Sequence, residues 1–143
     1  MGDKPPAAMK GVSMSATFLR RVLAVDAIGA AVSAVALIAA SATIAPLLGL
    51  PASLIEGVGI AFIPFAAFVG WLASREAPPA AGVWAVILLN ALWVVESLLV
   101  AAGMWFQPNS TGVAIIVVQA LGIATLAELE YVGLKKMRAS VAA

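Results

Sequence analysis

Four long apolar stretches dominate the sequence, and each has about the length that crosses a lipid bilayer. A transmembrane helix needs about 20 consecutive, mostly apolar residues. Short connections rich in Pro, Gly, Ser and Asn separate the stretches, which is typical of turns between helices. We therefore predict an all-α, polytopic membrane protein that forms a four-helix up-down bundle. The predicted spans are residues 22–45, 54–73, 81–106 and 112–134.

The residues outside these spans are too few for a soluble domain. We expect residues 1–20 to form a cytoplasmic N-terminal arm that is mobile or lies on the membrane surface. Residues 21–138 then form the transmembrane domain, and residues 139–143 form a cytoplasmic tail.

The positive charges all fall on one side of the predicted membrane. The connections at residues 46–53 and 106–111 carry no lysine or arginine. Cytoplasmic loops carry an excess of these residues, so the pattern predicts a multi-pass inner (plasma) membrane protein with both termini in the cytoplasm. The eight cations are Lys4, Lys10, Arg20, Arg21, Arg75, Lys135, Lys136 and Arg138.

A cleaved secretory signal is the alternative interpretation of the first stretch. Arg20 and Arg21 precede an apolar run that ends near small residues, as in a signal. The run is longer than the ~7–15 apolar residues of a signal core, and it contains Asp26. An uncleaved first helix therefore fits better.

Composition excludes several classes of protein. The chain is 64% hydrophobic and 10% charged, whereas soluble chains are about one quarter charged. A net charge of +1 provides no basic excess for binding nucleic acid. The chain has no Cys and no His, which excludes disulfides, thiolate nucleophiles, zinc sites built from Cys or His, and Ser-His-Asp triads. We therefore expect no enzyme activity, no metal and no cofactor.

Small residues spaced four apart mark helix faces that can pack closely. In lipid, helix association depends on van der Waals contact, which such faces permit. They favour a bundle that associates with itself or with a larger membrane complex. The pairs are Gly29 and Ser33, Ala30 and Ala34, Ala36 and Ala40, and Ala66 and Gly70.

The second span contains a proline near the predicted middle of the membrane. Pro64 lacks a backbone N–H, so we expect a kink at this position. Phe62, Phe65 and Phe68 cluster around it in the sequence, and Trp93 lies deep in the third span. These residues are the candidates for a kink and an apolar pocket.

Two acidic residues lie near the cytoplasmic ends of their spans. A charged side chain at the bilayer centre costs ~2.5–3.5 kcal/mol on insertion scales. Such a residue is therefore expected to pair with another group or to have a functional role. Asp26 and Glu128 should lie at similar depths because a helix rises ~1.5 Å per residue. An ion-pair network with the nearby cations is one interpretation, and a vestibule that gathers cations is another. Glu128 and Glu130 point nearly opposite ways, so both cannot face the bundle interior.

Glu96 lies far in the sequence from every lysine and arginine. A carboxyl group in lipid without a counter-charge favours its protonated form, which makes Glu96 a candidate proton carrier. We expect it to hydrogen-bond Gln119, which should lie at a comparable depth in the fourth span. Asn90, Trp93 and Ser97 share another face of the third span. The candidate binding or proton-carrying residues are Glu96, Asn90, Gln119, Asp26 and Glu128.

Five short blocks carry a resemblance to a known kind of protein. They are residues 47–51 (LLGLP), 63–66 (IPFA), 90–94 (NALWV), 119–121 (QAL) and 128–134 (ELEYVGL). On these blocks, residues 18–138 resemble small four-helix bacterial membrane proteins that have no assigned function. The resemblance implies a bacterial inner-membrane location and four spans, and it carries no activity.

Three functions follow as hypotheses. The first is a non-catalytic bundle in the lipid bilayer that forms a homo-oligomer or serves as an accessory subunit of a membrane complex. The second is a proton-linked transporter or channel subunit for a small solute, using Glu96. The third is lipid or quinone binding beside the phenylalanine cluster.

Overall fold

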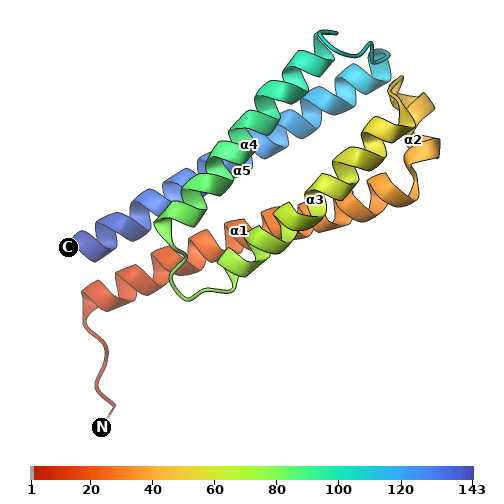
Figure 1. Cartoon of the computed structure of the whole chain (residues 1–143). Coiled ribbons are helices and arrows are strands. Elements are labelled where there is room, and N and C mark those ends of the chain that lie inside the picture. The colour runs from red at the N-terminus through yellow and green to blue at the C-terminus, as the bar shows by residue number, and fades with distance from the viewer. Residues whose placement is uncertain (1) are drawn as a thin grey trace.

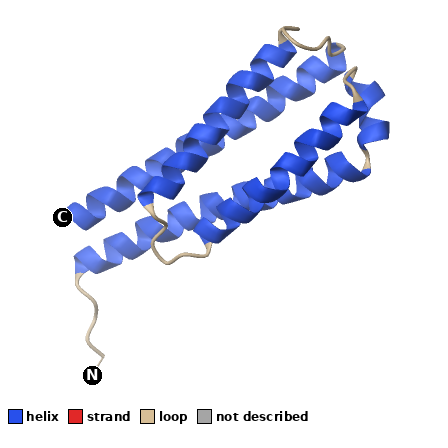
Figure 2. Ribbon diagram, viewed as in Figure 1, coloured by secondary structure: helices blue, strands red, loops and turns tan. Residues whose placement is uncertain are grey.

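Helices and short connections make up residues 2–143, which are the residues that the computed structural model describes. Figure 1 shows how the helices lie, and Figure 2 shows only helices and loops in this part of the chain. Four of the helices, α1, α3, α4 and α5, are long and apolar enough to span a membrane, as predicted. The helices are α1 (Ala7–Ala39), α2 (Ser41–Leu48), α3 (Ala52–Ala73), α4 (Ala80–Ala101) and α5 (Ser110–Ala142).

Two of the predicted spans extend past the C-terminal ends of their helices. The first span does not continue to residue 45, because the chain breaks at Ala40 and residues 41–48 form the separate helix α2. Pro46 lies inside α2, where its ring crowds the preceding turn and disfavours one long helix. The third span ends at Ala101 rather than at residue 106. Gly103 follows with φ 78°, a left-handed conformation that ends helices and that glycine adopts without strain.

Most of the segment predicted as an N-terminal arm, residues 1–20, is helical. Met1 lies outside the described residues, but α1 already begins at Ala7 and packs against the C-terminal part of α5. Leu19 is fully buried there, and a Cβ atom on Gly133 would lie 3.2 Å from the Leu19 Cβ atom. The missing side chain of Gly133 therefore lets the two helices approach. Helix α5 continues to Ala142, past the predicted end at residue 134, and Ser140 lies 3.3 Å from Ser15 of α1.

The helices pack as two pairs that meet through α1 and α5. Helix α1 lies along α3, α4 lies along α5, and α1 also contacts α5. Both termini lie at one end of the molecule, and α2 lies at the other (Figure 1). Helix α3 touches α4 only sparsely; near the termini, Leu72 lies against Gly82. The bundle is therefore closed by packing on every side except that between α3 and α4.

The apolar core lies at the end of the bundle that holds the termini. It consists of residues from α1, α3, α4 and α5 that lose nearly all of their accessible surface. Beyond it, the space between α3 and α4 is less completely filled. The most deeply buried members are Leu19, Leu23, Val69, Leu72, Val83 and Val86.

Small residues bring α1 and α3 together within the chain. Ala30 and Ala34 are buried, and a Cβ atom on Gly59 would lie 3.1 Å from the carbonyl oxygen of Ala34. Gly29 and Ser33 instead line a cavity. The close approach predicted for the face of Ala30 and Ala34 is therefore used inside one molecule.

At the end of the bundle opposite the termini, Asn109 joins α2 to α5. Its side-chain oxygen accepts a hydrogen bond of 2.8 Å from the backbone N–H of Gly112 and caps α5. Its backbone N–H donates to the carbonyl of Leu48 at 3.0 Å, and its side-chain Nδ2 donates to the carbonyl of Pro46 at 3.3 Å. One residue therefore fixes this corner of the bundle.

Candidate functional site

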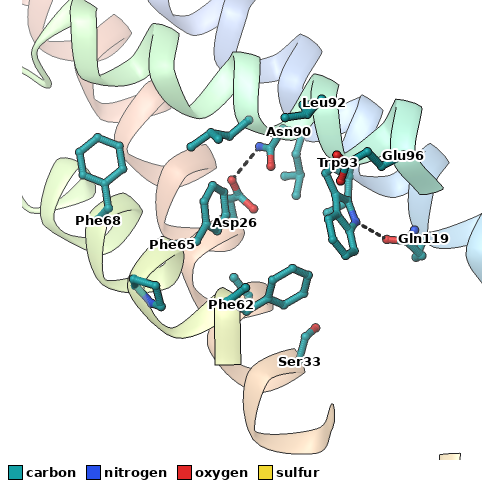
Figure 3. Close-up of a pocket in the computed structure, with 17 residues that line it drawn as sticks. Asp26, Ser33, Phe62, Phe65, Phe68, Asn90, Leu92, Trp93, Glu96 and Gln119 are labelled. Atoms are coloured by element: carbon teal, nitrogen blue, oxygen red, sulfur yellow. Dashed lines mark hydrogen bonds between the residues drawn. The ribbon is translucent and has the colours of Figure 1, made fainter. Parts of the chain in front are cut away.

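A buried polar network links three of the long helices. Asn90 of α4 donates from Nδ2 to Asp26 Oδ2 of α1 at 2.9 Å and to Glu130 Oε2 of α5 at 3.3 Å. Figure 3 shows Asn90 pointing at Asp26. The exposed fractions are 2% for Asp26, 3% for Asn90 and 0% for Glu130. These three side chains are thus withdrawn from lipid and water.

The two acids of this network share a single amide group. The Asn90 Nδ2 atom carries two hydrogens, so it can give one to each carboxyl group. Because both carboxyl groups bond the same nitrogen atom, they lie close to each other. Two neighbouring carboxylates in a low-dielectric interior repel strongly, and sharing one proton removes that repulsion. The other oxygen, Glu130 Oε1, is buried without a hydrogen-bond partner, so no donor stabilises a negative charge on it. The arrangement is therefore suited to holding one proton.

Two of the cations at this end of the bundle contact groups other than Asp26, in contrast to the predicted ion-pair network. Arg20 donates to the carbonyl oxygen of Ala73 at 3.0 Å, at the C-terminal end of α3. The guanidinium of Arg75 lies 4.4 Å from the centre of the Trp71 ring. Arg20 thus bonds a carbonyl at a helix C-terminus and Arg75 lies over an aromatic ring, and both are positions where a cation is favourable. Asp26 is instead held by the neutral amide of Asn90.

Glu130, not Glu128, is the α5 acid that faces the interior. Glu128 is exposed, and the two side chains do point in different directions, as the helical spacing predicted. Gly133, Leu134 and Met137 are buried on the same face as Glu130, at spacings of three, four and seven residues. Following that apolar pattern beyond Lys135 would have selected Glu130 from the sequence. The predicted span ended at residue 134 and so left out Met137, the last residue of this pattern.

A cavity of about 650 Å³ lies between α3 and α4, with Asp26 and Asn90 in its wall. We call it the Asp26 cavity. Phe62, Phe65 and Phe68 line it from α3 (Figure 3). The three phenylalanines singled out from the sequence therefore line one side of a cavity next to the polar network. Its other lining residues include Gly29, Ser33, Pro64, Leu89, Leu92, Trp93, Glu96 and Gln119.

A second cavity of about 550 Å³ extends toward α2, and we call it the Trp105 cavity. Leu50, Leu54 and Trp105 are among its lining residues. Phe62 and Trp93 line both cavities and contact each other edge to face, with ring centres 5.0 Å apart. These two rings bridge helices that otherwise hardly touch. The Phe62–Trp93 pair therefore stands where the two cavities meet.

The predicted hydrogen bond between Glu96 and Gln119 is absent. Gln119 accepts from Trp93 Nε1 at 3.0 Å (Figure 3) and donates to Ser97 Oγ at 2.9 Å. Both partners belong to the face of α4 that also carries Asn90, as the spacing predicted. Glu96 lies about 100° around the helix from Ser97, is exposed, and lines both cavities. Glu96 therefore lies at the margin of the two cavities and is not part of a buried hydrogen-bond network.

The charged groups that line the two cavities are all acidic. Asp26 and Glu96 line the first and Glu96 lines the second, and no lysine or arginine lines either. Within residues 2–143, no group of three or more acidic, histidine or cysteine side chains could hold a metal ion. The arrangement can hold a proton beside a space for a small, mostly apolar molecule.

Comparisons with protein-family models, with curated proteins and with solved structures give no match. The resemblance to four-helix bacterial membrane proteins therefore stays a prediction.

Proposed function

We propose that this protein binds a small lipophilic solute between α3 and α4 and carries it across the membrane in exchange for a proton. The proton is held by Asp26 and Glu130, rather than by Glu96 as the sequence predicted. The observation that carries this proposal is the Asp26 cavity, whose wall contains the buried Asp26, and Asn90 links Asp26 to the buried Glu130. Intramembrane acids that are costly to bury mark ion and proton pathways in transporters.

The shape of the cavity supports solute binding. Its volume of about 650 Å³ falls within the range of ~300–1,000 Å³ that is typical of small-molecule sites. Its lining is mostly apolar and aromatic, with few polar groups, which is the usual character of such sites. Because α3 and α4 touch so little, a lipophilic solute can enter sideways from the bilayer.

The two cavities support a route for the solute. They lie one after the other along α3 and α4 and are separated by the contact between Phe62 and Trp93. Gln119 anchors Trp93 through a hydrogen bond. We therefore expect the Phe62 ring to move when a solute passes, since side-chain rotation needs no rearrangement of the backbone.

The distribution of charge supports the predicted orientation. The two termini lie at the same end of the molecule, as an up-down bundle with an even number of spans requires. All eight lysine and arginine residues belong to the terminal segments or to the connection between α3 and α4. By the positive-inside rule, we propose that this end faces the cytoplasm of a cell whose inner membrane holds the protein.

The other two hypotheses have weaker support. The face of Ala30 and Ala34, which favoured self-association, is occupied by α3 within the chain. A homo-oligomer or a larger membrane complex stays a prediction that no specific contact favours. Binding of a lipid or quinone would use the same cavity and is an outcome of the experiment below.

The proposal is tested in liposomes that contain the protein and a trapped pH-sensitive dye. Three probes with one phenyl ring are added: the cation benzyltrimethylammonium, the neutral benzyl alcohol and the anion benzenesulfonate. We expect at least one probe to drive proton movement above that in empty liposomes. Asp26→Asn should abolish it, and the matched variant at the exposed acid, Glu128→Gln, should retain it.

Two results would contradict transport. One is proton movement that survives Asp26→Asn, which would place the proton elsewhere. The other is a lack of response to all three probes, together with a tightly retained lipid or quinone in native mass spectrometry of the purified protein. That second result would favour binding alone.

A further inference from the structure

We propose that the solute is a monovalent organic cation, whose charged group lies against Asp26 and whose apolar part lies among the aromatic side chains of the Asp26 cavity. This inference rests on the proposed function and names its substrate class. It follows from three features of the site: the sign of its charges, its aromatic walls and the balance of charge during proton exchange.

The electrostatics of the cavity favour a positive ligand. Its charged lining residues are Asp26 and Glu96. In a low-dielectric cavity these acids attract a cation and repel an anion more strongly than they would in water. Asn90 bonds only one Asp26 oxygen, Oδ2, so the carboxyl group keeps accepting capacity toward the cavity that it lines.

The walls suit the apolar part of such a cation. Figure 3 shows Phe65 and Phe68 on the α3 side of the cavity and Trp93 on the α4 side. Aromatic faces attract cations within about 6 Å of the ring centre, and quaternary ammonium ligands are commonly recognised by several such rings. A metal cation, by contrast, prefers a shell of oxygen ligands, and no group of three acids is placed to form one among the described residues.

The balance of charge links the cation to the proton. When the pair of Asp26 and Glu130 holds one proton, its net charge is about −1. If the proton leaves and a monovalent cation enters, the site again carries a net charge of about −1, because both carboxylates are then ionised beside one positive charge. A neutral solute would leave two buried carboxylates uncompensated, and an anion would need a further proton. Exchange with one proton therefore selects a cation.

The two carboxyl groups of the pair and the polar side chains near them come from three helices. Helix α1 contributes Asp26, α5 contributes Glu130, and α4 contributes the neutral Asn90 together with Glu96 at the cavity margin. The α3 residues that line the cavity are apolar. Glu96 can therefore raise the local concentration of cations, but the proton exchange is assigned to Asp26 and Glu130.

The test is calorimetric titration of the full chain in lipid nanodiscs with the same three probes, corrected against empty nanodiscs. We expect benzyltrimethylammonium to bind with release of about one proton, measured from the dependence of the heat on buffer ionisation. Its affinity should rise about tenfold per pH unit over the range in which the pair holds its proton. Benzyl alcohol should bind weakly and without proton release, and benzenesulfonate should not bind.

Four variants separate the roles of the acids. Asp26→Asn should lose cation binding by at least about tenfold, and Glu130→Gln should retain binding but lose its pH dependence. Glu96→Gln should weaken binding only a few-fold while it keeps the release of one proton. Glu128→Gln is the exposed control and should behave as the wild type. If Asp26→Asn does not fold, the pH dependence of cation binding to Glu130→Gln still tests the proposal. Its loss supports proton exchange by the pair, and an unchanged pH dependence contradicts it.

The outcomes distinguish this inference from the function on which it rests. Equal or stronger binding of benzyl alcohol, with proton movement in liposomes, would overturn the cation class and leave the carrier in place. Cation binding without proton release would overturn the exchange. A failure of all three probes in both experiments would overturn the carrier itself.

Discussion

The amide of Asn90 holds the carboxyl group of Asp26 at 2.9 Å and that of Glu130 at 3.3 Å, so one side chain connects two acids from different helices. The three residues lie on α4, α1 and α5 and are almost completely buried. This network is the only link in the described structure in which one side chain hydrogen-bonds the side chains of two other long helices. It is therefore both a structural joint and the candidate site for a proton.

The first prediction concerns this joint. Asn90→Ala should lower stability by at least about 1–3 kcal/mol, because it leaves buried acceptors without their donor. Thermal unfolding of the protein in one defined detergent measures the effect. Ser97→Ala, a buried polar position about two turns along the same face, is the control and should cost less, since Gln119 keeps its bond to Trp93. An Asn90→Ala variant as stable as the wild type would show that the network does not hold the helices together.

The second prediction concerns the close contact between α1 and α3. Gly59→Ala should destabilise the protein by about 1–3 kcal/mol, because the new Cβ atom would meet Ile38 Cγ1 at 2.8 Å. Gly57→Ala, two residues earlier, is the matched control: nothing lies within 4 Å of its added Cβ atom. That variant should be neutral or slightly stabilising, because alanine favours helix over glycine. Equal melting temperatures for the two variants would mean that the helices are farther apart than described.

The third prediction concerns the contact between Phe62 and Trp93. Phe62→Ala should weaken benzyltrimethylammonium binding by about 2- to 30-fold, the range expected from loss of one cation–π contact. It should also raise proton leak in liposomes, since the two cavities would then be continuous. Ile63→Ala changes the neighbouring, exposed α3 residue and should leave both measurements unaltered. Unchanged leak and affinity in Phe62→Ala would remove this ring from the proposed route.

The fourth prediction concerns the corner at Asn109. Asn109→Ala should cost about 1 kcal/mol, with a range of about 0.5–2 kcal/mol, because it removes the N-terminal cap of α5. Asn109→Asp should recover most of this loss, since a carboxylate can accept the same hydrogen bond from Gly112. Unfolding curves of the two variants, measured side by side, provide the comparison. An Asp variant no better than the Ala variant would assign the effect to the Nδ2 bond with Pro46 instead.

Much of the fold could be predicted because a bilayer demands long apolar helices. The spans at residues 54–73 and 112–134 lie within α3 and α5, and α5 begins directly after its capping residue Asn109. We did not predict the helix over residues 7–20 from the sequence, because this segment and its contact with α5 lie outside the apolar stretches. Hydropathy alone does not report such pairing between two helix extensions.

The candidate site could be predicted only in part. Asp26, Asn90 and the phenylalanine cluster were singled out because polar groups and proline are unusual within a span. Which of them meet depends on helix rotation, and for α5 the buried face is marked by Gly133, Leu134 and Met137, of which Met137 lies beyond the predicted end of the span. Likewise Gln119 bonds Trp93 and Ser97 instead of Glu96, because the face of α4 that turns inward excludes Glu96.

Infrared difference spectroscopy of the carboxyl C=O stretch tests the central claim most directly. The protein in nanodiscs at neutral pH should show the band of one protonated carboxyl group, which should disappear when benzyltrimethylammonium binds and be missing in Glu130→Gln. Glu128→Gln should keep the band and its response. A wild-type spectrum without that band, or a band that no probe alters, would contradict a proton held by Asp26 and Glu130 and exchanged for a solute.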